Sequence, residues 1–500
     1  MNIDLSKSYV IGLLAFFWAL TLGLLLQLFV LPYIFPDLHA GNGLLKGADW
    51  VWFNEIAVEL AQKINETGWD NWELRPYGQA PAGLAAAMYS LSGISKPFMY
   101  MPLNATLFAI AIAEMHRFIS YATKENKYTW VGVLPILVFP SSLLIYGQLH
   151  KDMFSIAGIF LIFNTLLLTS NQKGWGAYLS FFVRTILGLY LIWIVRPYFM
   201  EVVSIAWFAG MSILVLWILW RRPLQFIRLL IIVIGMLCIH QWSVSISSTQ
   251  DYFVPPPKVF PIDSNLIDSN LIDSNLIDSN LIDSNLIDSN LTDSNLIDSN
   301  LTDSNLTDSN LTDSNLIDSI SNLINSNVLV NLLTRKFDEL TGTFPARFDR
   351  VRRNFINGYP NAGSMMDLNV RFYSIPDLIN YTPRAIQIGY LAPFPNMWTV
   401  QGVNPGSGIM RKISGIEMLI AYISFMAGIV GLIIKRKSEY FVIIMSVLLV
   451  SAVILVVQTT AIPNVGTLYR MRLAPWHMTL GLSLYFAFKA FVLPRIKKDL

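Results

Sequence analysis

Long apolar runs separated by short polar segments dominate the hydropathy pattern of the chain. A helix needs about 20 predominantly apolar residues to cross the hydrocarbon core of a bilayer. Runs of about this length recur along the chain, and each predicts a membrane-spanning helix. The predicted spans are Tyr9–Leu31, Pro97–Met115, Thr129–Gln148, Met153–Leu168, Gly176–Val195, Phe199–Trp220, Phe226–Ile246, Ser414–Ile434, Tyr440–Val457 and Ala474–Leu493. The pattern therefore predicts an all-α polytopic membrane protein with about ten transmembrane helices.

The positions of lysine and arginine set the predicted orientation, because cytoplasmic loops of membrane proteins hold an excess of both. If Lys7 is cytoplasmic, the predicted spans place every short basic cluster on the same side. The clusters are Arg117 with Lys124 and Lys127, then Lys173, then Arg221, Arg222 and Arg228, then Lys435, Arg436 and Lys437, and finally Arg495, Lys497 and Lys498. Both termini are therefore expected in the cytoplasm.

Two large loops face the non-cytoplasmic side in this topology. The short apolar segments Pro81–Ser95 and Ala385–Trp398 lie in them and are expected to be re-entrant or surface-lying. Counting Pro81–Ser95 as a crossing would break the agreement of the basic clusters. The expected parts are an N-terminal transmembrane bundle over 1–246 with a first outer loop over 32–96, an outer loop region over 247–413, and C-terminal transmembrane helices over 414–500.

The second outer loop contains a low-complexity insert. From Asp263 the pentad Asp-Ser-Asn-Leu-Ile/Thr repeats about eleven times, so that the insert covers 263–318. The repeat resembles pentapeptide-repeat proteins, whose leucines stack inside a right-handed β-helix. The near-identity of the copies and the scarcity of apolar bulk favour an expanded DNA repeat that encodes a solvated, disordered loop. The β-helix stays open as the alternative, and neither structure assigns an activity.

Composition supports the membrane assignment and excludes some other classes. Apolar residues make up 54% of the chain and charged residues 14%, whereas a soluble domain carries about 25% charged residues. The net charge of +2 gives no case for nucleic-acid binding. Cys238 is the single cysteine, so the chain can form neither an internal disulfide nor a cysteine-based metal site.

The first outer loop contains an amphipathic segment from Asp49 to about Asn65. Its apolar residues recur at helical spacing and predict a helix that lies along the membrane surface. Asp49 stands at or just before the N-terminus of this helix, over the mouth of the bundle. By residue type alone, a helix N-cap is favoured for Asp49 over a catalytic role. The apolar positions are Phe53, Ile56, Ala57, Leu60, Ala61 and Ile64.

Charged residues of both signs meet the outer membrane boundary at four helix junctions. Such residues are costly and are commonly interfacial anchors or structural ion pairs. A mixed cluster also suits an anionic ligand with a hydroxyl to deprotonate, because arginine clamps phosphate bidentately and a carboxylate can act as a general base. The residues are Asp49, Glu55, Lys151, Asp152, Arg196, Glu201, Arg470 and Arg472, with His150 and His477 close by.

Other charged residues fall within the predicted spans or at their ends. Arg184, in the middle of a span, is expected either to pair within the bundle or to contact a lipid phosphate. Glu114 and His116, at a cytoplasmic end, are interpreted as anchors. Glu417 is expected to pair either with an outer arginine or within the bundle.

Several short motifs together resemble the GT-C class of membrane glycosyltransferases, which take a sugar from a polyprenyl-phosphate carrier on the outer leaflet. The first is Asp49 in the first outer loop, followed by a juxtamembrane helix with an aromatic-x-x-x-Ala pattern. The others are Phe139-Pro140 followed by Gly147-Gln-Leu-His-Lys-Asp152, then Arg196-Pro-Tyr198, and finally Asn464-Val-Gly-Thr-Leu-Tyr-Arg-Met-Arg472. The resemblance spans most of the chain outside the insert, and it does not identify the exact family.

The resemblance implies roles for individual residues. Asp49 would be the general base that activates an acceptor hydroxyl, and Asp152 would orient Lys151. The donor phosphate would be held by Lys151, Arg196, Arg470 and Arg472. Glu55 competes with Glu66, Asp70 and Glu73 for the place of a second acidic residue that some members carry in this loop. No cofactor is expected, and no ligand set supports a divalent metal.

The leading hypothesis is therefore a glycosyltransferase on the non-cytoplasmic face of a bacterial inner membrane. It would move a sugar from a polyprenyl-phosphate carrier to a glycan, lipid or protein acceptor. An O-antigen or exopolysaccharide polymerase or ligase is the enzymatic alternative, with an oligosaccharide on a pyrophosphate as donor. A transporter or flippase is the alternative of another class, but it predicts inverted repeats and midplane charges. The expected partners are the lipid-linked donor, the acceptor and membrane lipids.

Overall fold

A computed structural model describes residues 4–47, 49–171, 175–221, 226–248, 344–358, 362–400, 407–434 and 441–496. The repeat insert over 263–318, for which the sequence leaves a β-helix or a disordered loop open, lies outside the described residues.

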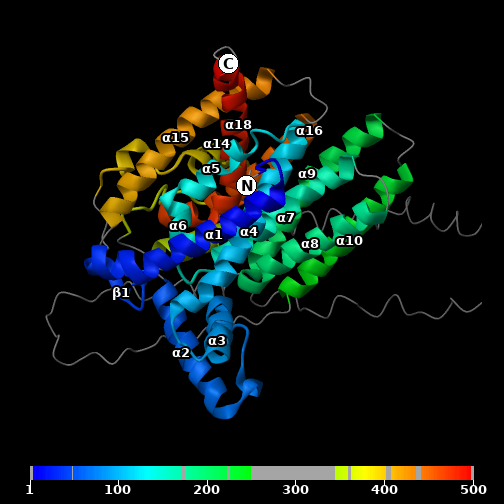
Figure 1. Ribbon diagram of the computed structural model, residues 1–500. Coiled ribbons are helices and arrows are strands. Elements are labelled where there is room, and N and C mark those ends of the chain that lie inside the picture. The colour runs from blue at the N-terminus through cyan, green and yellow to red at the C-terminus, as the bar shows by residue number, and fades with distance from the viewer. Residues whose placement is uncertain are drawn as a thin grey trace, which may run out of the picture.

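The described chain is built almost entirely from helices (Figure 1). The first half contains α1 (Ser8–Leu25), its π-helical continuation (Leu26–Ile34), α2 (Asp49–Thr67), α3 (Ala80–Ser92), α4 (Met101–Thr123), α5 (Trp130–Val138), α6 (Pro140–Tyr146), α7 (Asp152–Asn171), α8 (Trp175–Val195), α9 (Pro197–Arg221) and α10 (Phe226–Ser248). The second half contains a helical segment over 344–358, then α14 (Ile375–Leu391), α15 (Ser407–Ile434), α16 (Phe441–Ala461), α17 (Val465–Met471), α18 (Leu473–Ala487), a π-helical turn (Phe488–Val492) and α19 (Leu493–Ile496).

Short elements connect these helices. Single 3-10 turns cover Pro36–Leu38, Trp69–Asn71, Pro76–Gly78, Pro97–Tyr100 and Pro395–Met397. A small antiparallel hairpin pairs β1 (His39–Gly41) with β2 (Leu44–Leu45) just before α2.

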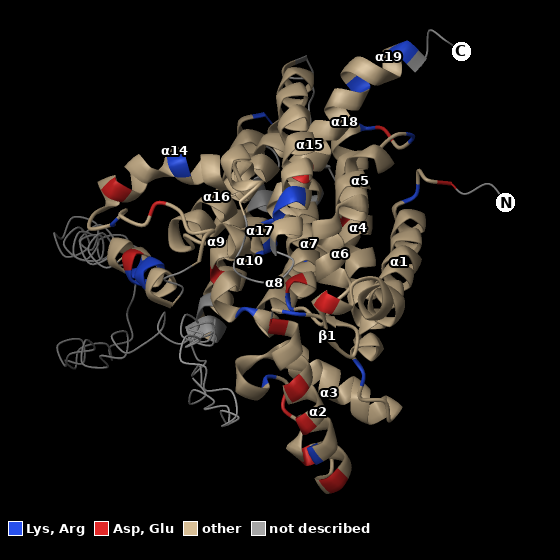
Figure 2. Ribbon diagram, turned by 90° about the vertical axis from the view of Figure 1, so that its left-hand side faces the viewer, with Lys and Arg blue, Asp and Glu red and all other residues tan. Residues whose placement is uncertain are grey.

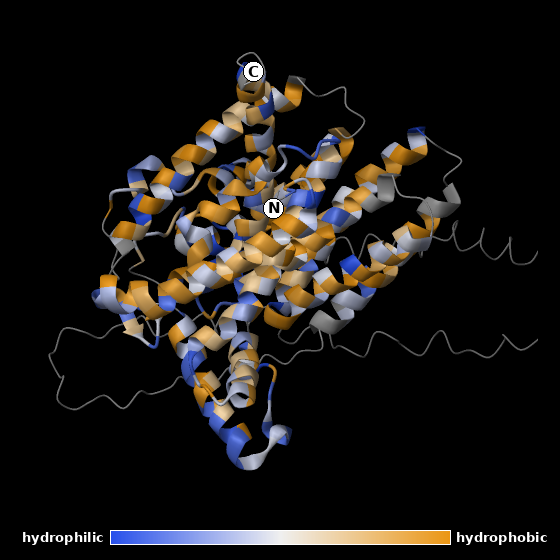
Figure 3. Cartoon of the chain, viewed as in Figure 1, coloured by the Kyte–Doolittle hydropathy of each residue, from blue (hydrophilic) through white to orange (hydrophobic). Residues whose placement is uncertain are grey.

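Seven segments of the described chain are long and apolar enough to cross a membrane, which makes this a multi-pass membrane protein. Figure 3 shows hydrophobic residues along the bundle helices and hydrophilic residues along α2. The seven are Ser8–Ile34, Pro97–Thr123, Trp175–Val195, Pro197–Arg221, Gly408–Ile433, Phe441–Ala461 and Leu473–Arg495, each matching a predicted span. The predicted spans Met153–Leu168 and Phe226–Ile246 correspond to shorter apolar helices, Asp152–Leu167 and Leu230–Ser243.

The predicted span Thr129–Gln148 is wrong as a single helix. The chain forms two short helices, α5 and α6, and Phe139 between them has an extended backbone (φ −69°, ψ 127°). Pro140 explains the break, because a proline has no N–H to donate and disfavours helical geometry at the residue before it. The total number of crossings stays a prediction.

Small residues allow close helix packing inside the bundle. A Cβ atom on Gly158 of α7 would lie 2.4 Å from the carbonyl oxygen of Gly188 on α8. The reciprocal distance, from a Cβ atom on Gly188 to the carbonyl oxygen of Gly158, would be 2.7 Å. Membrane helices rely on such small residues, because lipid provides no hydrophobic drive between helices and close contact must supply the attraction.

Arg184 pairs within the bundle, which is one of its two predicted outcomes. Its Nη2 atom lies 3.3 Å from Oε1 of Glu114 on α4, and both side chains are largely buried. The pair also shows that Glu114 is more than the interfacial anchor that its position suggests. A buried ion pair of this kind neutralises two charges that hydrocarbon would tolerate poorly.

The α2–α3 hairpin lies outside the bundle, and we call the side that carries it the outer side (Figure 1). The starts of α1 and α19 lie toward the opposite side (Figure 2). The six predicted apolar positions of α2 are all buried, so the predicted amphipathic helix is confirmed. α3 packs against α2, and the predicted place of α2 along the membrane surface stays a prediction. Tyr89 of α3 donates a hydrogen bond to Asn54 of α2 across this contact (2.8 Å).

The segment that follows the repeats returns to the bundle. Gly389 near the end of α14 packs against α16, where its Cβ position would lie 3.2 Å from the Cβ of Leu455. The predicted surface-lying segment Ala385–Trp398 is thus the last part of α14 together with a 3-10 turn, held against α16.

Candidate functional site

Three segments from distant parts of the chain meet on the outer side of the bundle. Asp49 begins α2, Lys151 precedes α7, and Arg470 lies in the last turn of α17. The Nη1 atom of Arg470 lies 3.7 Å from Oδ2 of Asp49. The ammonium of Lys151 lies 5.8 Å from the centre of the Phe53 ring, one turn along α2. Figure 2 shows charged segments gathered here, between α2 and the ends of the bundle helices.

Lys151 is a buried cation, with 7% of its surface exposed. Among the described residues, no carboxylate oxygen lies within salt-bridge distance of its Nζ atom, and Phe53 supplies a cation–π contact instead. Burying a charge without an ionic partner is unfavourable. The carboxylates of Asp49 and Asp152 act on Lys151 only at longer range, through their electrostatic fields.

Asp152 and Arg196 form a buried ion pair beside Lys151. Arg196 Nη2 lies 2.6 Å from Asp152 Oδ1, and both side chains are less than a tenth exposed. Arg196 joins the end of α8 to the start of α9, so the pair ties these helices to the start of α7. The Asp152 carboxylate thus pairs with Arg196 and does not form an ion pair with Lys151.

His150 completes the cluster, and sequence reasoning did not assign it a role. Its Nδ1 atom accepts a hydrogen bond from the Asp152 backbone N–H (3.1 Å) and also lies 3.2 Å from Oδ2 of the Asp152 carboxylate. Burial lowers the pKa of His150 to about 4, against the opposing field of Asp152. Its Nε2 is buried and has no hydrogen-bond partner in the described chain. The Trp50 ring lies over the imidazole, with 5.7 Å between ring centres.

The loop that carries His150 and Lys151 is anchored by buried amides. Asn104 of α4 donates to the carbonyl oxygens of Tyr146 (3.1 Å) and Gln148 (2.6 Å). The Gln148 side chain in turn accepts a hydrogen bond from the backbone N–H of Leu45 (3.1 Å). The hairpin that leads into α2 is thus joined to the loop before α7, and this connection brings Asp49 near Lys151.

The charges of the cluster favour an ionised Asp49. Burial opposes ionisation, but the fields of Arg470 and Lys151 outweigh it and hold the pKa of this carboxyl below its usual range. With His150 neutral, the cluster contains two carboxylates, Asp49 and Asp152. Its cations are Lys151, Arg196 and Arg470, so the cluster carries a net positive charge and attracts an anion.

Arg472 lies apart from this cluster, although only one residue separates it from Arg470. Its Nη1 atom donates to the carbonyl oxygen of Gly389 (2.7 Å), and its guanidinium lies over the rings of Tyr469 (4.7 Å) and Trp476 (5.2 Å). It is 1% exposed. These contacts make Arg472 a link between the end of α14 and the start of α18.

Glu417 also lies in this second group. It accepts hydrogen bonds from the Ser141 backbone N–H (2.9 Å) and from the Tyr469 hydroxyl. Glu417 therefore pairs with groups inside the bundle, and its direct partners are not arginines. Glu55 is exposed on α2 and Glu201 is half-buried on α9, and no hydrogen bond or ion pair among the described residues joins either of them to Asp49. The described residues contain no group of three or more histidine, cysteine or acidic residues that could hold a metal ion.

Comparison with known proteins identifies the insert. A family model for pentapeptide repeats matches residues 262–296 and 284–320, with eight copies. No curated protein and no solved structure matches the chain. The fold and the family model together define a multi-pass α-helical membrane protein that carries a pentapeptide-repeat insert.

Proposed function

We propose that the protein is a glycosyltransferase that takes a sugar from a polyprenyl-phosphate carrier on the outer side of a bacterial inner membrane. The observation that carries the proposal is Lys151, a buried cation with no carboxylate within salt-bridge distance in the described chain, beside Asp49 and Arg470. A phosphate would supply the missing charge to Lys151 and Arg470. The Asp49 carboxylate would then face the reacting end of the donor.

Transfer needs a base and a site for the leaving anion, and the cluster offers both. The acceptor hydroxyl oxygen forms a bond to the anomeric carbon as the bond from that carbon to the phosphate oxygen breaks. The hydroxyl proton passes to Asp49. The polyprenyl phosphate departs as an anion between Lys151 and Arg470, which stabilise the charge that develops in the transition state.

The cations also link donor binding to the basicity of Asp49. Without donor, Arg470 and Lys151 keep the pKa of Asp49 low, so this carboxylate is a weak base. A bound phosphate shares both cations and adds negative charge nearby, and each effect raises the pKa of Asp49. The carboxylate therefore becomes the stronger base once a donor is in place. The buried Nε2 atom of His150, which has no hydrogen-bond partner in the described chain, is available to the same ligand.

The test compares surface glycans and polyprenyl-linked sugars in a deletion strain that carries the wild-type gene, Asp49→Asn or Glu59→Gln. Asp49→Asn keeps the shape of the side chain but removes the base, and Glu59→Gln is a matched control on the exposed face of α2. We expect loss of a glycan and accumulation of its lipid-linked donor with Asp49→Asn, at normal expression, and full rescue with Glu59→Gln.

The same measurement separates the alternatives. Accumulation of an oligosaccharide on a pyrophosphate carrier, in place of a monosaccharide on a phosphate, would indicate a polymerase or ligase. Unchanged glycans and unchanged carrier lipids in the deletion strain would exclude all three enzymes and favour a transporter.

A further inference from the structure

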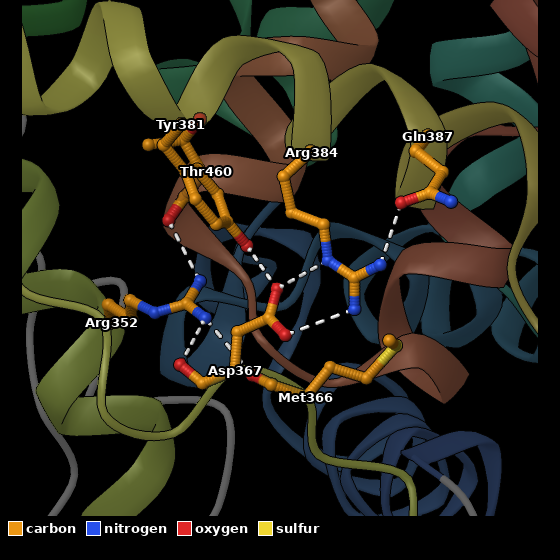
Figure 4. Close-up of polar contacts among 7 residues, drawn as sticks. All are labelled: Arg352, Met366, Asp367, Tyr381, Arg384, Gln387 and Thr460. Carbon is orange, nitrogen blue, oxygen red and sulfur yellow. Dashed lines mark hydrogen bonds and ion pairs between the residues drawn. The ribbon is translucent and has the colours of Figure 1, made fainter.

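A buried arginine organises the segment that follows the repeats. Arg352, in the helical segment 344–358, has no measurable exposure. Its Nη2 atom donates to the carbonyl oxygens of Met366 (3.0 Å) and Asp367 (2.9 Å), and its Nη1 atom donates to that of Thr460 (3.3 Å) at the end of α16. Figure 4 shows the guanidinium between these two stretches of backbone. Arg352 thus fastens residues 366–367 to the end of α16.

The side chain of Asp367 stabilises the same stretch of backbone from within. Asp367 has a left-handed backbone conformation (φ 53°), which is unfavourable for residues other than glycine. Its carboxylate accepts hydrogen bonds from Arg384 (3.0 and 3.1 Å) and from the Tyr381 hydroxyl (3.0 Å), both on α14. The turn is therefore fixed between α14 and α16 (Figure 4).

From this turn, hydrogen bonds lead directly to the start of α17. Met366 N–H donates to the Pro463 carbonyl oxygen (3.0 Å), and Val465 N–H donates to that of Ser364 (3.0 Å). The Ser364 hydroxyl donates to Asn464 Oδ1 (3.0 Å). The same oxygen accepts from the N–H groups of Gly466 and Thr467 and caps the helix.

The helix that these bonds hold carries Arg470. With seven residues, α17 is too short to be stable alone, because isolated helices of fewer than about 12 residues are marginal in water. At its far end α17 is joined to α18 through Arg472 alone, and the contacts at its start fix the other end. We propose that Arg352 and Asn464 are positioning residues, which fix α17 through residues 364–367 and so place Arg470 against Asp49. The effect on catalysis rests on the proposed function, whereas the effect on geometry does not.

The geometric test is a cross-linking experiment, which is simple to set up because only one native cysteine, Cys238, has to be removed first. In a Cys238→Ser background, Asp49→Cys and Arg470→Cys are joined with a short bis-maleimide, and the linked peptide is quantified by mass spectrometry. We expect Asn464→Ala to lower the yield about fivefold, the population change that follows from losing a helix cap. Arg352→Met should lower the yield as well, because it releases residues 366–367 from the end of α16. Asn464→Asp keeps the capping oxygens and should restore the yield.

Arg371→Met is the matched control. It removes the Arg371–Asp349 ion pair (2.8 Å) of the same outer segment without touching residues 364–367. Wild-type yield in this control, with loss in Asn464→Ala, supports the proposal. Equal loss in Arg371→Met, or unchanged yield in both Arg352→Met and Asn464→Ala, overturns it. If Arg352→Met fails to fold, the cross-linking yield of Asn464→Ala alone decides the proposal: a lower yield supports it and an unchanged yield overturns it.

A second readout is donor turnover with the native site residues in place. If wild-type protein transfers sugar, Asn464→Ala should raise the KM for donor more than it lowers kcat, and Asn464→Asp should not. If wild-type protein transfers no sugar, the proposed function fails, while the cross-linking result still decides whether Arg352 and Asn464 position Arg470.

Discussion

Arg470 faces Asp49 at 3.7 Å, whereas Arg472, two residues further on, points to the carbonyl oxygen of Gly389. The two arginines come from one short motif and would be taken as equivalent by residue type. The helical geometry of α17 separates them, because residues two apart on a helix point in different directions. One arginine therefore belongs to the charged cluster, and the other belongs to the contact between α14 and α18.

This separation predicts different results for two matched substitutions. Arg470→Ala should leave stability near wild type and weaken donor use by about 10- to 100-fold, because a charge-assisted hydrogen bond is worth about 1.5–3 kcal/mol. Arg472→Ala should lower the free energy of unfolding by about 2–3 kcal/mol, because it leaves a buried carbonyl of α14 without its donor. Thermal unfolding in detergent and donor kinetics measure the two effects. Equal stability loss in both variants would contradict the assignment.

His150 predicts a pH dependence of stability. Its pKa is about 4 in the folded protein and near 6.5 when unfolded. Between these values the unfolded state binds a proton that the folded state does not, so the free energy of unfolding falls as pH falls through this window. The contribution is about 1 kcal/mol per pH unit. His150→Gln should therefore lose less stability than wild type between pH 7 and pH 5, as measured by thermal unfolding. The same loss in both proteins would count against a buried neutral His150.

The α7–α8 contact predicts the effect of adding one methyl group. Gly158→Ala would place a Cβ atom 2.4 Å from the Gly188 carbonyl oxygen, and overpacking of this kind costs about 1–3 kcal/mol. Gly176→Ala is the control on α8, because nothing lies within 4 Å of its Cβ position. We expect this control to be neutral or slightly stabilising, since alanine favours helices. Melting temperatures in one detergent compare the two, and a stable Gly158→Ala protein would show that the helices can separate at little cost.

The sequence by itself determined the membrane class, the position of most helices and the buried face of α2. These features depend on local hydrophobic periodicity, which each segment carries within its own residues. The hydropathy pattern does not reveal the break at Pro140, because the run from Thr129 to Gln148 is apolar on both sides of this proline. It also does not show that α3 packs against α2, since an apolar face looks the same in sequence whether lipid or another helix covers it.

Only the tertiary structure decided which charged residues share a site. Asp49, Lys151 and Arg470 come from three outer segments, and their contact depends on buried amides such as Asn104 and on the anchoring of α17. Arg352 carries no pattern that distinguishes it from Arg350, which is exposed, or Arg353, which is half-buried, because its role comes from the carbonyl groups that surround it after folding. Which groups a charged side chain contacts depends on long-range packing, and the local sequence around that residue does not determine it.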